Sequence, residues 1–137
     1  MMMTSSRTGA IVPLMKLTLE PLARIHLIRG YSDSEILIGE QSVRSSCIVS
    51  ARELITEWEP ANFGEFAPEH LEKILALDPE LILLGTGPVQ RFVSASLRAA
   101  LAARRVGLET MQLGAACRTY NVLVQEERRV AAALFLR

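Results

Sequence analysis

The fold of this chain is decided by the stretch 81-LILLGTGP-88, in which four large apolar residues lead into two glycines and a proline. An apolar run bounded by turn residues is typical of a strand that is buried on both faces, as in a parallel sheet. Beyond this stretch, strand and helix patterns alternate, which favours βαβ units joined by right-handed crossovers. The pattern leaves open whether the last strand is parallel or antiparallel. The predicted elements are strands over 81–84, 107–111 and 130–136 and helices over 89–104 and 115–124.

The chain before this stretch predicts a β-rich N-terminal half, because short β-forming runs are separated by Gly, Pro, Ser and Asp. A helix is predicted just ahead of the stretch, since Leu71, Ile74 and Leu75 have helical spacing and a proline lies near its first turn. The predicted elements are strands over 15–20, 24–29, 35–38 and 43–49 and a helix over 68–77.

Length and composition limit the class of protein. At 137 residues the chain has the length of one domain, and we expect a flexible N-terminal tail over 1–13 and a single α/β domain over 14–137. The apolar runs are far shorter than the roughly 20 residues that cross a bilayer, so we expect no membrane insertion and a cytoplasmic protein. Lys plus Arg equals Asp plus Glu at 15 each, which disfavours a nucleic-acid partner. Cys47 and Cys117 have no metal-type spacing, so free thiols, no metal and no cofactor are expected.

Two polar interruptions of the apolar second half predict a site. The first interruption, at 85–88, follows one predicted strand. The second, at 116–121, includes Arg118 and lies in the helix that 112–114 connect to the next strand. The carboxyl ends of adjacent parallel strands lie at one sheet edge, where bare N–H groups and an arginine can bind an anion or a carboxylate. A structural interpretation stays open as well, in which the glycines only form a tight turn and Arg118 only pairs with a carboxylate such as that of Glu109.

The sequence lacks the motifs of several enzyme classes. No Gly-Lys-Ser/Thr follows Gly87, which excludes a P-loop, and Gln90 stands where a dinucleotide fingerprint needs its third glycine. Cys117 near a helix N-terminus is the one reactive group we consider, yet His26 and His70 lie in the first half without a motif. No catalytic residue is therefore assigned.

Aromatic residues gather in the connecting segment before the helix at 68–77. Trp58, Phe63 and Phe66 form this group, which is either a satellite core or, if exposed, an anchor for a protein partner.

The order and spacing of motifs in the second half carry a family resemblance. Gly85-Thr86-Gly87-Pro88 is followed, at the matching distance, by Arg118-Thr119-Tyr120-Asn121 and then by an apolar last strand. In this the chain resembles the DUF498, Mth938-like family of uncharacterised small bacterial and archaeal proteins that includes mitochondrial complex I assembly factor 3. The resemblance covers roughly residues 15–137 and is strongest from Leu81 onward.

The resemblance implies a single three-layer α/β domain with a central mixed, mostly parallel sheet in which one strand runs against the rest. For the mitochondrial branch it implies an assembly role through binding of other proteins, without known catalysis. We therefore expect a non-enzymatic protein-binding module, an assembly factor for a respiratory or membrane complex. The alternative is a small-molecule anion-binding protein or enzyme that uses the same sheet edge. The candidate binding residues are Gly85, Thr86, Gly87, Cys117, Arg118, Thr119, Tyr120 and Asn121.

Overall fold

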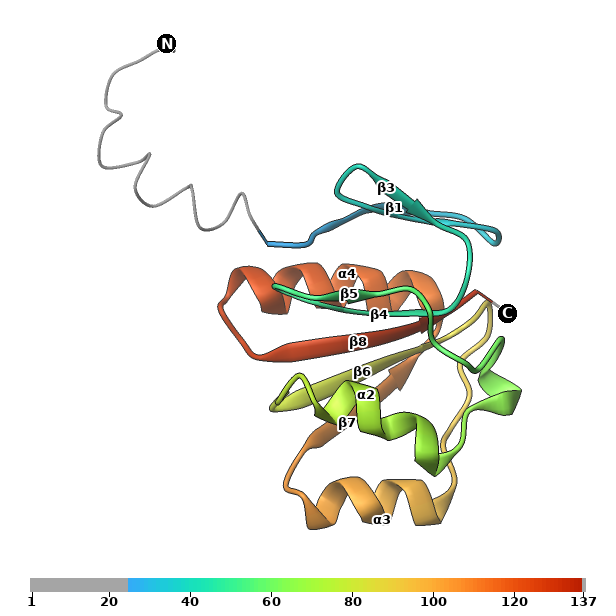
Figure 1. The fold of residues 1–137 in the computed structure, drawn as a ribbon, viewed down its shortest axis with the longest axis vertical. Helices are drawn as coiled ribbons and strands as arrows, with labels where there is room; N and C mark the ends of the chain where they lie inside the picture. Colours follow the sequence, from blue (N-terminus) through green and yellow to red (C-terminus); the bar gives the residue numbers. More distant parts are fainter. Residues whose placement is uncertain (1–24, 137) are drawn as a thin grey trace, which may run out of the picture.

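The computed structural model describes residues 25–136, which form two β-sheets and the helices that cover them (Figure 1). The tail expected over 1–13 and the strand expected over 15–20 lie outside the described residues. Within the described residues, the first half of the chain contains five strands between residues 28 and 55, which confirms the β-rich N-terminal half.

The larger sheet has five strands in the order β5-β4-β8-β6-β7. The last strand of the chain, β8, pairs in parallel with β6 and in antiparallel with β4. Because β5 is antiparallel to β4, only β4 runs against the other strands, and the mixed, mostly parallel sheet is confirmed. The strands are β4 (Cys47–Ser50), β5 (Leu54–Ile55), β6 (Leu81–Thr86), β7 (Gly107–Met111) and β8 (Val130–Phe135).

The helices lie on opposite faces of this sheet (Figure 1). One face packs against α2 (Leu71–Leu75) and α3 (Ala95–Ala103), and the other packs against α4 (Leu113–Gln125). The two 3-10 turns η1 (Phe63–Glu65) and η2 (Pro68–His70) precede α2. Two crossovers join parallel strands, β6-α3-β7 and β7-α4-β8. They have the same hand, because β7 and β8 lie on either side of β6 and because α3 and α4 cover opposite faces of the sheet.

A second sheet of three strands lies beyond α4 and adds a layer to the expected architecture (Figure 1). Its apolar residues share one core with α4 and with the near face of the larger sheet. The run 43–49, predicted as one strand, is divided between the two sheets, and the buried Ser46 donates its hydroxyl to the Pro60 carbonyl at the point of division. The strands are β1 (Ile28–Tyr31), β2 (Ile36–Ile38) and β3 (Gln41–Val43).

The helix predicted over 89–104 begins six residues later, at Ala95. Ser94 is its N-cap and accepts a hydrogen bond from the Leu97 N–H at 3.2 Å, which satisfies one of the unpaired donors of the first turn. The preceding residues 88–94 form a loop that is exposed except at the half-buried Val93, whereas sequence periodicity assigned 89–94 to the helix.

Candidate functional site

Gly85 lets α4 approach the central strand β6 closely. A Cβ atom at this position would lie 3.0 Å from the Ala116 Cβ and 3.0 Å from the Leu134 Cδ2. Side chains larger than hydrogen do not fit at that distance without a shift of the neighbours, so Gly85 has a packing role in the core.

Thr86 organises the loop that follows β6. Its buried hydroxyl donates to the Val89 carbonyl at 2.7 Å and accepts from the Arg91 N–H at 3.0 Å. Gln90 adds a bond from its Nε2 to the Thr110 carbonyl at 2.9 Å. Side chains thus satisfy loop backbone groups that a helix would otherwise have paired, which explains why α3 starts late.

Gly87 joins the loop to the N-terminus of α4. Its φ of 96° lies in the region that favours glycine, and its carbonyl accepts the Leu113 N–H at 2.8 Å. The loops after β6 and β7 turn to opposite faces of the sheet, which is the arrangement that forms a ligand crevice in open α/β sheets. Here, however, two N–H donors at the N-terminus of α4 are already paired. The Leu113 N–H donates to the Gly87 carbonyl, and the Gly114 N–H donates to the Gln112 side chain at 2.7 Å.

Arg118 lies one turn into α4 on the solvent side. Its Nη1 is 3.5 Å from the Tyr31 hydroxyl, and the Tyr31 ring covers Gly114, where a Cβ would meet the hydroxyl at 2.2 Å. Among the ion pairs of residues 25–136, none joins Arg118 to Glu109. Thr119, next to Arg118, is half-buried.

Tyr120 and Asn121 hold the N-terminal segment on α4. The fully buried Tyr120 donates its hydroxyl to the His26 carbonyl at 2.7 Å. The Asn121 amide accepts from the Ile28 N–H at 2.9 Å and donates to the Ile28 carbonyl at 2.8 Å. Asn121 therefore pairs both backbone groups of one residue as a neighbouring strand would, and it fixes the start of β1.

Cys117 is buried beside Cys47. Burial raises the pKa of the Cys117 thiol to about 12, against a smaller lowering effect of Arg118. Burial, with a smaller contribution from Cys117, raises the pKa of Cys47 to about 12 as well. Both thiols are therefore protonated at neutral pH, whereas nucleophilic attack requires the thiolate.

The two histidines have backbone partners away from Cys117. The Nδ1 of His26 lies 3.2 Å from the Ser50 carbonyl, and the Nδ1 of His70 accepts the Ala67 N–H at 2.9 Å. In the described part of the chain, no group of three or more His, Cys, Asp or Glu side chains could hold a metal ion.

The aromatic residues of the connecting segment belong to the core. Trp58 and Phe63 are only 7% and 8% exposed, and their ring centroids lie 5.3 and 5.6 Å from that of Phe135 on β8. Of the two alternatives left open by the sequence, the satellite core therefore agrees with the structure.

Among residues 25–136, the large apolar side chains that are most exposed lie in the loop after Gly87 instead. Val89 is 65% exposed and Phe92 is 71% exposed. A small groove of about 200 Å³ lies beside Phe92, where the Arg91 guanidinium stacks over the Phe63 ring at 5.1 Å. Sequence reasoning missed these residues because it placed them in a helix, although Ser94 with its N-cap spacing to Leu97 could have signalled the later helix start.

No helix within residues 25–136 combines the length and the apolar composition needed to cross a membrane. The longest of these helices, α4, has 13 residues.

Comparison with known proteins places these features in a wider group. The family model described as "Protein of unknown function (DUF498/DUF598)" matches residues 28–135. Among solved structures, one from Xanthomonas campestris is 34% identical with a TM-score of 0.75, and the match covers 99% of this chain and 92% of that one. A Mth938-like domain from Bordetella pertussis is 24% identical with a TM-score of 0.72, over 80% of this chain and 85% of that one, and shows the shared fold.

Two curated relatives have names that refer to membranes or membrane complexes. "NADH dehydrogenase (ubiquinone) 1 alpha subcomplex assembly factor 3" of Xenopus tropicalis is 27% identical over 114 residues, 82% of this chain and 62% of that protein. The "13 kDa major membrane protein" of Francisella tularensis is 38% identical over 65 residues, 47% of this chain and 53% of that protein. The chain thus spans between about half and somewhat under two thirds of these relatives.

Proposed function

Because the chain belongs to the DUF498/DUF598 family of proteins of unknown function, whose relatives include an assembly factor, we propose that it is a non-enzymatic protein-binding module that assists assembly of a respiratory or membrane complex. The proposed place of action is the cytoplasm, and the proposed partner is a protein subunit of such a complex. The first support is the resemblance to the assembly factor, which extends over 82% of this chain.

The observation that carries the proposal is the exposure of Val89 and Phe92 on a loop with a fixed backbone. Burial of a large aromatic side chain by a partner is favourable, and aromatic residues dominate the energetics of many protein interfaces. Since the Thr86 hydroxyl and the Gln90 amide already hold the loop, a partner would lose little conformational entropy on binding it.

Three of the candidate residues identified from the sequence support this loop, and the others lie on α4. Gly85, Thr86 and Gly87 position the loop through packing, side-chain hydrogen bonds and a positive φ. Arg118 and Thr119 lie on α4, which covers the opposite face of the sheet from α3, and Arg118 meets the Tyr31 hydroxyl there. The remaining candidates, Cys117, Tyr120 and Asn121, keep α4 and the N-terminal sheet in place.

Complementation in the native host tests the proposal. A strain that lacks the protein would receive the wild type, Phe92→Asp or Val122→Asp, and assembled NADH dehydrogenase would be measured on native gels. Val122 is a matched control because it is 54% exposed on α4, whereas Phe92 lies in the loop. We expect Phe92→Asp to leave assembly at the level of the deletion strain and Val122→Asp to restore it. Full restoration by a folded Phe92→Asp protein would contradict the proposal.

A further inference from the structure

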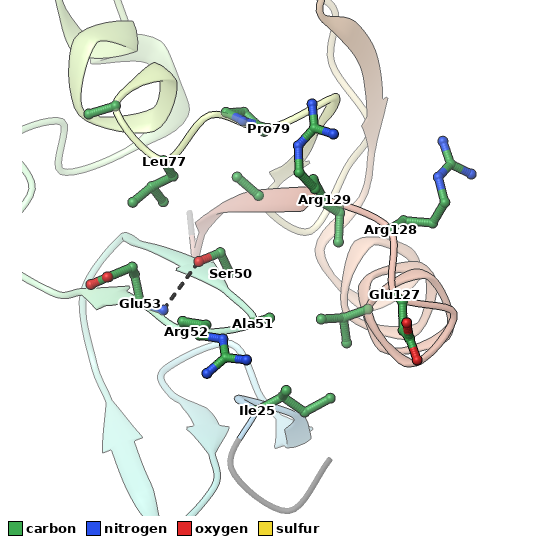
Figure 2. Close-up of a pocket in the computed structure, with 14 residues that line it drawn as sticks. Ile25, Ser50, Ala51, Arg52, Glu53, Leu77, Pro79, Glu127, Arg128 and Arg129 are labelled. Atoms are coloured by element: carbon green, nitrogen blue, oxygen red, sulfur yellow. Dashed lines mark hydrogen bonds between the residues drawn. The ribbon is translucent and has the colours of Figure 1, made fainter. Parts of the chain in front are cut away.

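A cavity of about 730 Å³ lies at the end of the sheet opposite Gly85 and Gly87 (Figure 2). It opens where β6 and β8 begin and where β4 ends, between α2 and α4. Its volume falls within the range of roughly 300–1,000 Å³ that is typical of small-molecule sites. The cavity is thus separate from the exposed loop, and nothing in the proposed function accounts for it.

Three chain connections surround the cavity, and each is fixed to its neighbour. In the turn at 50–53 the Ser50 hydroxyl accepts the Glu53 N–H at 3.2 Å, and His26 N–H donates to the Ala51 carbonyl at 3.0 Å. The turn that ends α2 and the turn that ends α4 are joined around Glu80.

The Glu80 contacts are specific. The Arg129 carbonyl accepts the Glu80 N–H at 2.8 Å, and the Glu80 carboxylate accepts the Arg129 N–H at 2.9 Å. Arg128 Nε lies 3.4 Å from the same carboxylate, and Arg129 Nε donates to the Asp78 carbonyl at 3.1 Å. The walls of the cavity are therefore held by hydrogen bonds on more than one side.

The lining divides into an apolar interior and a charged rim. Ile25, Leu77, Val124 and Val130 supply buried or half-buried aliphatic surface. The rim carries three arginines, at 52, 128 and 129, and two glutamates, at 53 and 127.

Arg52 differs from the other two rim arginines. Arg128 and Arg129 come from one turn, and Arg52 lies on the opposite wall near Ile25 (Figure 2). Arg128 pairs with the Glu80 carboxylate, and the Arg129 side chain donates to the Asp78 carbonyl. Among residues 25–136, the exposed Arg52 side chain takes part in neither an ion pair nor a hydrogen bond. Arginine presents a planar donor fork that matches a carboxylate.

We propose that this cavity binds a small amphipathic carboxylate, with an aliphatic chain against Leu77, Val124 and Val130 and a carboxylate head on Arg52. Burial of each methylene of such a chain contributes favourably, and the arginine fork selects the anionic head. The apolar interior and the arginine on the rim together indicate this class of ligand. An apolar interior alone would also accept a neutral molecule, and a cationic rim alone would also accept phosphate.

The test is a titration of the full-length protein with sodium octanoate, followed by amide resonances in ¹H–¹⁵N spectra. We expect saturable shifts of the amides at 50–53 and 128–131. Arg52→Gln should weaken binding about tenfold, which corresponds to about 1.4 kcal/mol. Ala76→Trp, at an exposed position that lines the cavity, should fill the space and reduce binding as well.

Three controls make the outcome decisive. Arg98→Gln removes an exposed arginine of α3 outside the cavity lining and should leave the affinity unchanged. Octanol tests the need for the anionic head, and acetate tests the need for the apolar chain, so both should bind more weakly than octanoate. The proposal is overturned if octanoate causes no saturable shifts at these amides, if Arg52→Gln and Arg98→Gln have equal effects, or if octanol binds as tightly. Retained spectral dispersion shows that each variant is folded.

Discussion

Gly85 has the strictest steric requirement of the residues at the end of β6. A methyl group there would lie 3.0 Å from the Ala116 Cβ and the Leu134 Cδ2 and 3.5 Å from the Leu113 Cα, so α4 and the Leu134 side chain would have to shift. We expect Gly85→Ala to lower the free energy of unfolding by about 1–3 kcal/mol, measured by urea denaturation. Gly30→Ala is the control, since its Cβ would lie 3.7 Å from Leu37 Cδ1, an ordinary contact. Equal effects of the two substitutions would contradict the packing role.

Cys117 should react slowly, because its buried thiol has a pKa raised to about 12. At neutral pH we expect iodoacetamide to alkylate it more slowly in the folded protein than in the same protein unfolded in urea. A faster rate in the folded protein would instead indicate an activated nucleophile and would support the enzyme alternative.

Residue types near Arg118 predicted a polar cluster but not its partners. Asn121 pairs with main-chain groups of Ile28, 93 residues away, and Tyr120 pairs with His26, 94 residues away. A main-chain partner leaves no mark in the sequence pattern. The sequence therefore identified Tyr120 and Asn121 as part of a family motif but could not indicate that they pair with the backbone of His26 and Ile28.

At the scale of elements, Asn121 connects α4 to β1. Replacement by Ala would leave the N–H and carbonyl of the buried Ile28 without their protein partners, so we expect a loss of about 1–3 kcal/mol and faster amide hydrogen exchange in β1–β3. The neighbouring exposed residue provides the control, since Val122→Ala should change stability by less than about 0.5 kcal/mol. Unchanged exchange in Asn121→Ala would show that the apolar contacts alone hold the small sheet.

Glu80 connects the turns that follow α2 and α4, and it makes this connection sensitive to pH. The Arg129 N–H, together with the Arg128 guanidinium, holds the pKa of the Glu80 carboxyl below its ordinary value. The unfolded chain therefore takes up this proton first as the pH falls. The stability that Glu80 contributes is present above about pH 5 and is lost as the pH falls through the lowered pKa.

Glu80→Gln should reduce this acid-dependent loss. Chemical denaturation at a series of pH values should show a shallower decline in the free energy of unfolding below about pH 5 for Glu80→Gln than for the wild type. Glu72→Gln, an exposed substitution on α2, should decline as the wild type does. If the free energy of unfolding declined equally below about pH 5 in Glu80→Gln and in the wild type, the Glu80 carboxylate would contribute nothing to stability.

The strands of the second half could be predicted from apolar runs, and β7 was predicted with its observed bounds. The start of α3 could not, because a buried Thr86 hydroxyl competes with helical hydrogen bonds over the residues before Ser94. The break between β3 and β4 was missed for a similar reason, since Ser46 pairs with Pro60 across the structure.

At the scale of the whole molecule, the two ends of the sheet differ in character. The carboxyl ends of β6 and β7 are closed by the Leu113 to Gly87 hydrogen bond and present Val89 and Phe92 outward. The opposite end holds the large cavity. The sequence indicated the first location through its glycines, whereas the second depends on three connections that come together only in the folded chain.

Photo-crosslinking tests the claim that the loop at 88–92 contacts a protein partner. Benzoylphenylalanine would replace Phe92 in one protein and Val122 in another, and both would be irradiated in the native host. We predict a crosslink from position 92 to a subunit of a respiratory or membrane complex and none from position 122. No crosslink from position 92, or the same products from both positions, would contradict the claim.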